Sequence, residues 1–246
     1  MENRINLALI VVIVVIGSFS NFVLAGSSWQ KDFNLSERTL VPAGRNDFFI
    51  LEPGFQLILE SSNERLIIIV MDETRVIDGI TTRVVEEREW KNGQLKEVSI
   101  NFFAIDEQTK DIFYFGEEVD MYKNNQVVSH KGAWLAGKNK ARAGMIMPAK
   151  PQVGMKYYQE VAPRVAMDRA EVISLDETLD TPAGTFTNCM KTKEGTSLNF
   201  FEREYKTYAP GIGLIQDQKL LLVKYGFVSA PEQDRTMGSI EEKSDY

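Results

Sequence analysis

Acidic side chains are the residues of this sequence with the most obvious capacity for chemistry. Glu86, Glu87 and Glu89 crowd one short segment that also contains Arg83 and Arg88. Paired carboxylates can act as general acid and base in a glycosidase when their environments separate their pKa values. A segment with both signs of charge is more typical of a solvated strand face crossed by ion pairs. We therefore predict no catalytic residue here, and a carboxylate-based hydrolase is the least favoured of the functions considered below.

Two further acidic groups offer oxygen ligands of the kind that calcium prefers. Neither group has the glycine and the terminal glutamate of an EF-hand loop. We interpret both as clusters in turns and predict no metal site. The groups are Glu117, Glu118 and Asp120, and Asp176, Glu177 and Asp180.

Nucleophilic and metal chemistry is limited by one histidine, His130, and one cysteine, Cys189. A single cysteine and a single histidine exclude an internal disulfide, a Cys₄ or Cys₂His₂ zinc site and a His₃ centre. No Gly-x-Ser-x-Gly motif presents a serine nucleophile. The thioethers of Met145, Met147 and Met155 could bind copper(I), although methionine equally fills irregular apolar gaps. We predict no cofactor, a buried Cys189, and a His130 that is exposed or bonded to the backbone.

The charge balance bears on possible partners. Lys and Arg number 28 and Asp and Glu number 35, so the net charge is -7. This is the wrong sign for neutralising a phosphate backbone, and nucleic acid is not an expected partner. A length of 246 residues and a hydrophobic content of 43% suit one globular domain.

The N-terminal residues have the three regions of a secretory signal peptide. Arg4 precedes an apolar run from Leu7 to Ile16, and Val23 and Ala25 suit cleavage after Ala25. An uncleaved signal anchor is the alternative, because the span from Leu7 to Ala25 approaches the roughly 20 residues that cross a bilayer. Either way we predict export to a periplasmic or extracellular location. No transmembrane span is expected after cleavage.

The rest of the chain predicts antiparallel strands. Runs of β-branched and aromatic residues are separated by turn signals, with Asp78-Gly79 and Asn92-Gly93 as two-residue hairpin turns. We expect a mainly β fold: a single antiparallel, strongly curved sheet or open barrel. The predicted boundaries are a signal peptide over residues 1–25, one β domain over residues 26–228, and a disordered polar tail over residues 229–246.

Residues from Gly132 to Gly154 show no strand or helix period. Pro148 and Pro151 interrupt this segment, so we predict a long irregular loop. Its apolar residues, Trp134 among them, must pack against the sheet or against a ligand. A plain connection between two halves of the sheet is favoured over a lid above a cavity.

Two phrases resemble a family of uncharacterised secreted prokaryotic proteins. They are TPAGTFTNC at Thr181–Cys189 and YKTYAPGIGLI at Tyr205–Ile215. These proteins look like relatives of curved-sheet carriers of the lipoprotein-localisation type. The resemblance implies a curved sheet and no assigned reaction. Gly184 and Gly211 with their prolines preset turn geometry, so the phrases indicate architecture and not a catalytic site.

The favoured function is therefore a non-catalytic binding module for an apolar molecule or a lipid-like ligand. The alternative is an envelope-associated structural or protein-interaction domain without a small ligand. The same aromatic and thioether side chains would line a groove in the first case and form plain core in the second. The predicted ligand-binding residues are Trp134, Trp90, Phe102, Phe113, Phe115, Met145 and Met147.

Overall fold

The computed structural model describes residues 28–199, 201 and 203–228. The predicted signal peptide and the predicted polar tail lie outside the described residues. Within the described residues the helical structure is one 3₁₀ turn, η1 (Leu35–Glu37), and strands make up most of the rest. No helix in this part of the chain has the length and apolar character needed to cross a membrane. The mainly β prediction is confirmed.

A meander of hairpins forms the first half of the sheet, as the turn signals predict. Asp78, Gly79, Asn92 and Gly93 all have positive φ, between 48° and 79°, which is the conformation that two-residue hairpin turns require. The strands in the N-terminal half of the chain are β1 (Leu40–Val41), β2 (Gly44–Asn46), β3 (Phe49–Leu51), β4 (Phe55–Glu60), β5 (Glu64–Ile77), β6 (Ile80–Lys91), β7 (Gln94–Asp106), β8 (Ile112–Lys123) and β9 (Gln126–Ser129). Of these, β2 and β3 pair with each other and form a separate two-stranded sheet.

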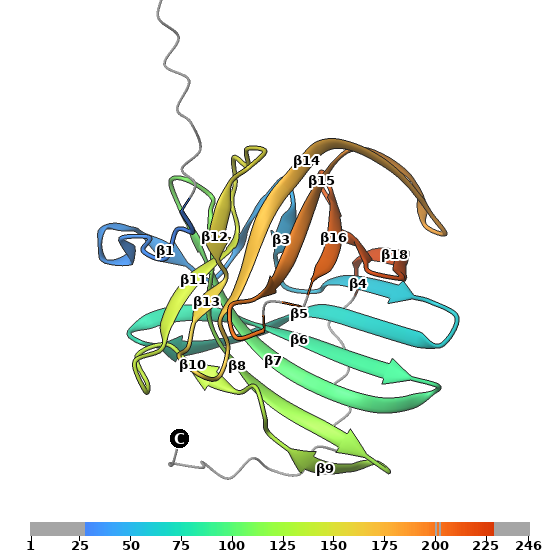
Figure 1. Ribbon diagram of the computed structural model, residues 1–246, viewed down its shortest axis with the longest axis horizontal. Coiled ribbons are helices and arrows are strands. Elements are labelled where there is room, and N and C mark those ends of the chain that lie inside the picture. The colour runs from blue at the N-terminus through green and yellow to red at the C-terminus, as the bar shows by residue number, and fades with distance from the viewer. Residues whose placement is uncertain (1–27, 200, 202, 229–246) are drawn as a thin grey trace, which may run out of the picture.

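The second half includes a long β14–β15 hairpin that arches over one side of the molecule in Figure 1. A bend at Gln159 separates two short strands, Lys156–Tyr158 and Glu160–Val161. The strands are β10 (Trp134–Leu135), β11 (Arg142–Met147), β12 (Lys156–Tyr158), β13 (Glu160–Val161), β14 (Asp168–Thr181), β15 (Gly184–Thr196), β16 (Glu204–Ala209), β17 (Gly213–Asp217) and β18 (Leu220–Phe227).

One large antiparallel sheet runs through both halves in the order β12-β14-β15-β16-β17-β18-β4-β5-β6-β7-β8-β11-β13. Pairing of β18 with β4 joins the halves. The sheet curves into a nearly closed barrel with one unsealed seam. Close packing near that seam depends on Gly144, because a Cβ there would lie 2.5 Å from the carbonyl oxygens of Tyr158 and Gln159.

The segment from Gly132 to Gly154 is less irregular than expected, since it contains β10 and β11. Both strands pair with β8, and Met145 lies opposite Phe113 in that pairing. Apolar residues on the free edge of β8 supply the surface that this segment covers. The prediction that the whole segment is a loop is therefore wrong over β10 and β11. Its role as a connection between the two ends of the sheet fits the favoured interpretation.

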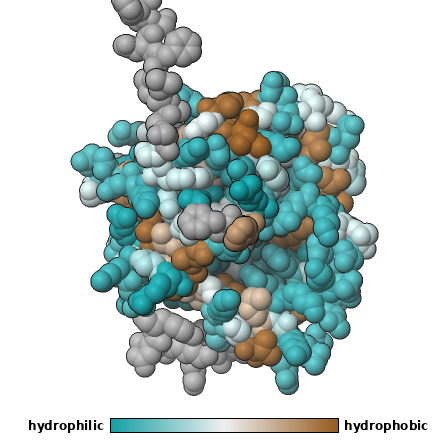
Figure 2. All heavy atoms as spheres, in the orientation of Figure 1, coloured by the Kyte–Doolittle hydropathy of each residue, from teal (hydrophilic) through white to brown (hydrophobic). Residues whose placement is uncertain are grey.

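Apolar side chains from both halves fill one continuous core, including the fully buried Leu59, Phe102, Ile105 and Ile215. The face shown in Figure 2 is mostly hydrophilic, with apolar side chains in scattered groups. Burial of the apolar side chains in this core stabilises the barrel without disulfides.

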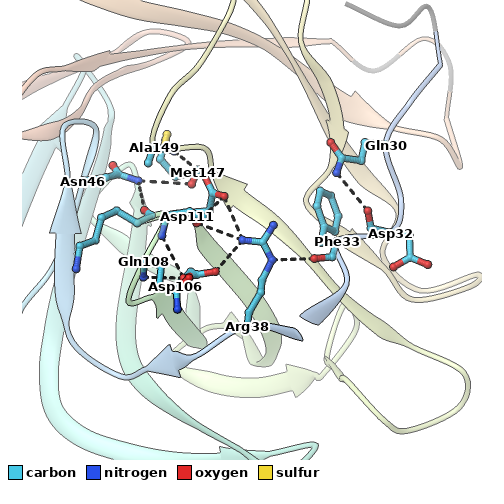
Figure 3. A network of polar contacts seen from close by, with 12 residues as sticks. Gln30, Asp32, Phe33, Arg38, Asn46, Asp106, Gln108, Asp111, Met147 and Ala149 are labelled. Carbon is cyan, nitrogen blue, oxygen red and sulfur yellow. Dashed lines mark hydrogen bonds and ion pairs between the residues drawn. The ribbon is translucent and has the colours of Figure 1, made fainter. Parts of the chain in front are cut away.

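An arginine ties the N-terminal segment to the barrel (Figure 3). Arg38 Nη1 donates to Asp106 Oδ2 at 2.8 Å and to Asp111 Oδ2 at 3.3 Å. Asp106 Oδ1 also accepts the backbone N–H groups of Gln108 and Thr109. Burial alone would raise the pKa of Asp106, but these N–H donors and the guanidinium outweigh it and lower the pKa. We call Arg38, Asp106 and Asp111 the arginine clamp.

Candidate functional site: an acidic cavity in the barrel

A cavity of about 630 Å³ lies between strands from both halves of the barrel. We call it the barrel cavity. The exposed side chains of Arg65 and Lys91 lie at its edge. Its volume falls within the range of small-molecule pockets, roughly 300 to 1,000 Å³.

One wall of the barrel cavity is apolar, because period-2 alternation turns one face of each strand inward, and polar groups make up nearly half of the lining. On β5 the inward residues are Leu66, Ile68 and Val70, and Val85 lies opposite Val70 on β6. The apolar lining consists of Phe48, Phe49, Ile50, Phe55, Leu57, Leu66, Ile68, Val70, Val85, Phe103, Ile146, Ile212, Leu214 and Leu220.

A polar wall continues this lining along β6. The alternation that turns Val85 inward also turns Glu87 and Glu89 inward, and both line the barrel cavity. Glu86 and Arg88 belong to the opposite face, where Arg88 Nε donates to Glu86 Oε1 at 2.6 Å. The prediction of a solvated face crossed by ion pairs is correct for Glu86 and Arg88. Glu87 and Glu89 instead face the cavity without an ion pair, although Glu89 is exposed to solvent as predicted.

Lys206 lies on the same wall and is paired with two carboxylates. Its Nζ lies 3.3 Å from Glu194 Oε2 and 3.7 Å from Asp217 Oδ2. Thr192 and Tyr208 also donate hydroxyl hydrogen bonds to Glu194 Oε1. Burial would raise the pKa of Glu194, but Lys206 and these donors outweigh it and lower the pKa. Glu194 in turn raises the pKa of Lys206, so this pair is ionised at neutral pH.

Glu87 and Glu89 lack the ion pair and the hydrogen bonds that stabilise the ionised form of Glu194. No hydrogen bond or ion pair joins either carboxylate to another residue that the structure describes. Burial raises the pKa of Glu87 to about 7, with Glu89, Asp217 and Glu97 adding to the shift and Lys206 opposing it. Partial desolvation by the cavity wall likewise raises the pKa of Glu89 to about 7, although this residue remains exposed to solvent, and Glu97 directly across the strand pair adds to the shift. Near neutral pH each carboxyl is therefore about half ionised.

More buried carboxyls surround the polar wall. Burial raises the pKa of Glu117 to about 8, an effect that the nearby Tyr114 hydroxyl only partly offsets. Glu160 is fully buried and its pKa is raised by burial and by Asp168, although its Oε1 accepts the Asp168 N–H. Tyr114 donates to Asn101 Oδ1 at 2.5 Å. The barrel interior thus holds more carboxyl groups than amines.

The structure places one predicted ligand-binding residue, Trp90, on the barrel cavity. Trp134 is buried and packs edge-on against Tyr114 with ring centroids 5.2 Å apart, and its Nε1 has no hydrogen-bond partner among the described residues. The other predicted residues are buried in the core and do not line the cavity; they are Phe102, Phe113, Phe115, Met145 and Met147. The predicted residues therefore do not form one site.

His130 and Cys189 are placed as predicted. His130 Nδ1 contacts the Val119 carbonyl oxygen at 2.9 Å and Asp120 Oδ1 at 2.8 Å, with its side chain partly exposed. Cys189 is a buried free thiol. Across the described ranges no group of three or more histidine, cysteine or acidic side chains is arranged to hold a metal ion.

Glu87, Glu89 and Lys206 are cavity residues that the sequence analysis did not predict, as are the residues of the apolar lining. Alternation was a usable signal for Glu87 and Glu89, because both share a face with Val85, which the barrel buries. No comparable signal marks Lys206, whose two partners come from neighbouring strands that only the sheet order brings beside it.

The fold and the cavity together define a nearly closed antiparallel β-barrel with an amphipathic interior. Comparisons of the chain with family models, with curated proteins and with solved structures give no match. A functional argument for this chain therefore rests on the barrel cavity.

Proposed function

We propose that this protein is a non-catalytic binding module that holds an apolar, lipid-like molecule in the barrel cavity. The observation that carries the proposal is the cavity itself, about 630 Å³ with a continuous apolar wall beside a polar one. A barrel built only as a structural element would fill this space with side chains, as the core at Leu59 and Phe102 is filled. Concave apolar sites with a few polar groups are typical of ligand pockets.

The N-terminal sequence supports the same proposal. A signal peptide would take the protein out of the cytoplasm, where lipid-like molecules need carriers to cross aqueous compartments. The resemblance of Thr181–Cys189 and Tyr205–Ile215 to secreted relatives of curved-sheet carriers points in the same direction. We propose export on these grounds.

A cavity-filling variant tests the proposal. Ile68 lines the cavity, and its neighbour Ile67 belongs to the other face of β5. We expect the purified protein to bind the uncharged fluorophore N-phenyl-1-naphthylamine, Ile68→Trp to abolish binding, and Ile67→Trp to preserve it. Native mass spectrometry with solvent extraction should detect a bound apolar molecule. Absence of both probe binding and extractable ligand would support the structural alternative.

The two tryptophans provide a second test. Trp90 lines the barrel cavity and Trp134 is core, so Trp90→Ala should weaken binding of the probe with little change in stability. Trp134→Ala should lower the free energy of unfolding by about 3 to 5 kcal/mol. Weakened binding in a folded Trp134→Ala variant, with Trp90→Ala unaffected, would place the ligand beneath the segment from Gly132 to Gly154 instead.

One observation favours a carboxylate-based hydrolase as the second candidate. Glu194 has a lowered pKa and Glu87 a pKa of about 7, and Lys206 influences both groups. Such a separation is what acid–base catalysis needs. Hydrolysis of chromogenic glycosides that Glu87→Gln and Glu194→Gln both abolish would favour this candidate over the binding module.

A further inference from the structure

We propose that the ligand of the barrel cavity carries a cationic group, an amine or a quaternary ammonium, that pairs with Glu87 and Glu89 while its apolar part contacts the apolar lining. This inference rests on the proposed function, since it specifies the chemistry of the molecule bound in that cavity. It draws on the position of the two carboxylates, on their lack of hydrogen-bond and ion-pair partners, and on the absence of an ion pair between them and any described cation of the cavity wall.

Glu87 and Glu89 lie at the border between apolar and polar lining. On one side β5 places Ile68 opposite Glu87 and Leu66 opposite Glu89, and both apolar side chains line the cavity. On the same face of β6, Val85 precedes Glu87. A molecule that contacts Ile68 and Leu66 with its apolar part therefore brings its polar end to the two carboxylates.

Most cations on the cavity wall are engaged elsewhere, and Lys219, which also lines the cavity, interacts electrostatically with Glu64. Lys206 Nζ is shared between Glu194 and Asp217. At the edge of the cavity Arg65 pairs with Glu60, Lys91 pairs with Glu64, and Lys96 donates to Gln94. Within the described residues none of these cations forms an ion pair with Glu87 or Glu89.

Two adjacent carboxylates without a cation favour a positively charged guest and disfavour a negatively charged one. The raised pKa values of Glu87 and Glu89, each about 7, follow from the same geometry. A bound cation would lower both pKa values, so binding near neutral pH should release protons. The charged and titratable groups that face these two carboxyls are Lys206, Asp217, Glu97, Glu204, Glu117 and Tyr114.

The test uses three dodecyl compounds that differ in the head group: dodecyltrimethylammonium, dodecanol and dodecanoate. The affinity of each compound is measured by its displacement of N-phenyl-1-naphthylamine from the protein at pH 8 and physiological salt. Each compound is kept below its own critical micelle concentration. We expect the ammonium compound to bind about 10-fold or more tightly than the alcohol, because its positive charge is attracted to the two carboxylates in a partly desolvated site. Dodecanoate should bind most weakly.

Matched variants assign any preference to the two carboxylates. The double variant Glu87→Gln/Glu89→Gln should bind dodecanol as before and lose the preference for the ammonium. Glu86→Gln, which removes one acidic group from the opposite face of the same strand, should retain it. Retention in Glu86→Gln also excludes general attraction to a chain of net charge -7 as the cause.

The outcomes separate the two proposals. Equal binding of the ammonium and the alcohol, or tightest binding of dodecanoate, overturns the cationic inference and leaves the binding module in place. A preference that survives in Glu87→Gln/Glu89→Gln also overturns it. Failure of all three compounds and of the fluorophore to bind overturns the proposed function and the inference together.

Discussion

Asp106 in the arginine clamp and Glu87 in the barrel cavity are both carboxylates removed from bulk water, and the protein treats them in opposite ways. Asp106 receives a guanidinium and two backbone N–H donors, and its pKa is lowered. Glu87 receives no hydrogen bond from any described residue, and its pKa is raised to about 7 by burial. A carboxylate with a full set of hydrogen-bond and ion-pair partners is typical of a structural site. Incomplete satisfaction beside a cavity costs stability and is expected where a ligand completes the contacts.

Carboxylates with raised pKa values and carboxylates with lowered pKa values should change the free energy of unfolding with pH in opposite directions. This pH dependence is the largest effect that we expect. Groups with raised pKa values, such as Glu87 at about 7 and Glu117 at about 8, bind protons more tightly in the folded state. Their contribution to the free energy of unfolding is fully present below the unfolded pKa, near 4.5, and is lost as the pH rises to about 8. The free energy of unfolding should fall by a few kcal/mol in total over this range.

The lowered pKa of Asp106 has the opposite sign, because its contribution is lost as pH falls below the unfolded value. Urea denaturation from pH 3 to pH 9 should therefore give maximal stability near pH 5. Stability that stays constant or rises between pH 5 and pH 8 would contradict the account of the cavity carboxyls.

Breaking the arginine clamp is the next largest effect. Arg38→Ala leaves the buried Asp106 carboxylate with its N–H donors only, and should lower the free energy of unfolding by about 3 kcal/mol at pH 7. Arg45→Ala is the matched control, because it removes an ion pair with Glu52 that is exposed. A loss in Arg38→Ala no greater than the loss in Arg45→Ala would show that the clamp contributes little.

Neutralising Glu87 should stabilise the free protein. Glu87→Gln keeps the shape of the side chain and removes a charge that burial disfavours, so unfolding at pH 8 should cost more by on the order of 1 to 3 kcal/mol. At pH 4, where the carboxyl is already neutral, the gain should vanish. Glu86→Gln removes the outer pair with Arg88 and should give no gain at either pH. If Glu87→Gln destabilised the protein at pH 8, the ionised Glu87 carboxylate would have stabilising partners in the native protein.

A third carboxylate, Asp120, gives the smallest effect. It is paired with His130 where both side chains remain partly exposed. Because solvent screens such pairs, His130→Ala should change the free energy of unfolding by less than about 1 kcal/mol. A larger loss in thermal or urea denaturation would show that the contact with the Val119 carbonyl supports the edge of β8.

The sequence predicts the meander well because its signals are local. Asp78-Gly79 and Asn92-Gly93 adopt the positive φ values that their turns need, and both hairpins form there. The segment from Gly132 to Gly154 was harder to predict, since β10 and β11 are stabilised by pairing with β8 and carry little intrinsic pattern. Tertiary context decides such strands.

The candidate site was predicted less well, for a related reason. Aromatic residues such as Phe102 and Phe113 were assigned to a ligand because their types suit one, yet the core uses the same types. Charged residues such as Glu87 were assigned to solvent because most charges lie there. Strand alternation identifies which residues share a face, but the closure of the sheet decides which face becomes the interior.

The ionisation of Glu87 in the free protein shows whether its carboxyl lacks a cationic partner in the barrel cavity. The side-chain carboxyl ¹³C resonance of Glu87, assigned by its loss in Glu87→Gln, can be followed by NMR from pH 3 to pH 10. The account predicts a midpoint of about 7, as expected for a carboxyl in the cavity without a cationic partner. A midpoint near the ordinary value of 4.5 would contradict it, because the carboxyl would then be solvated or already paired.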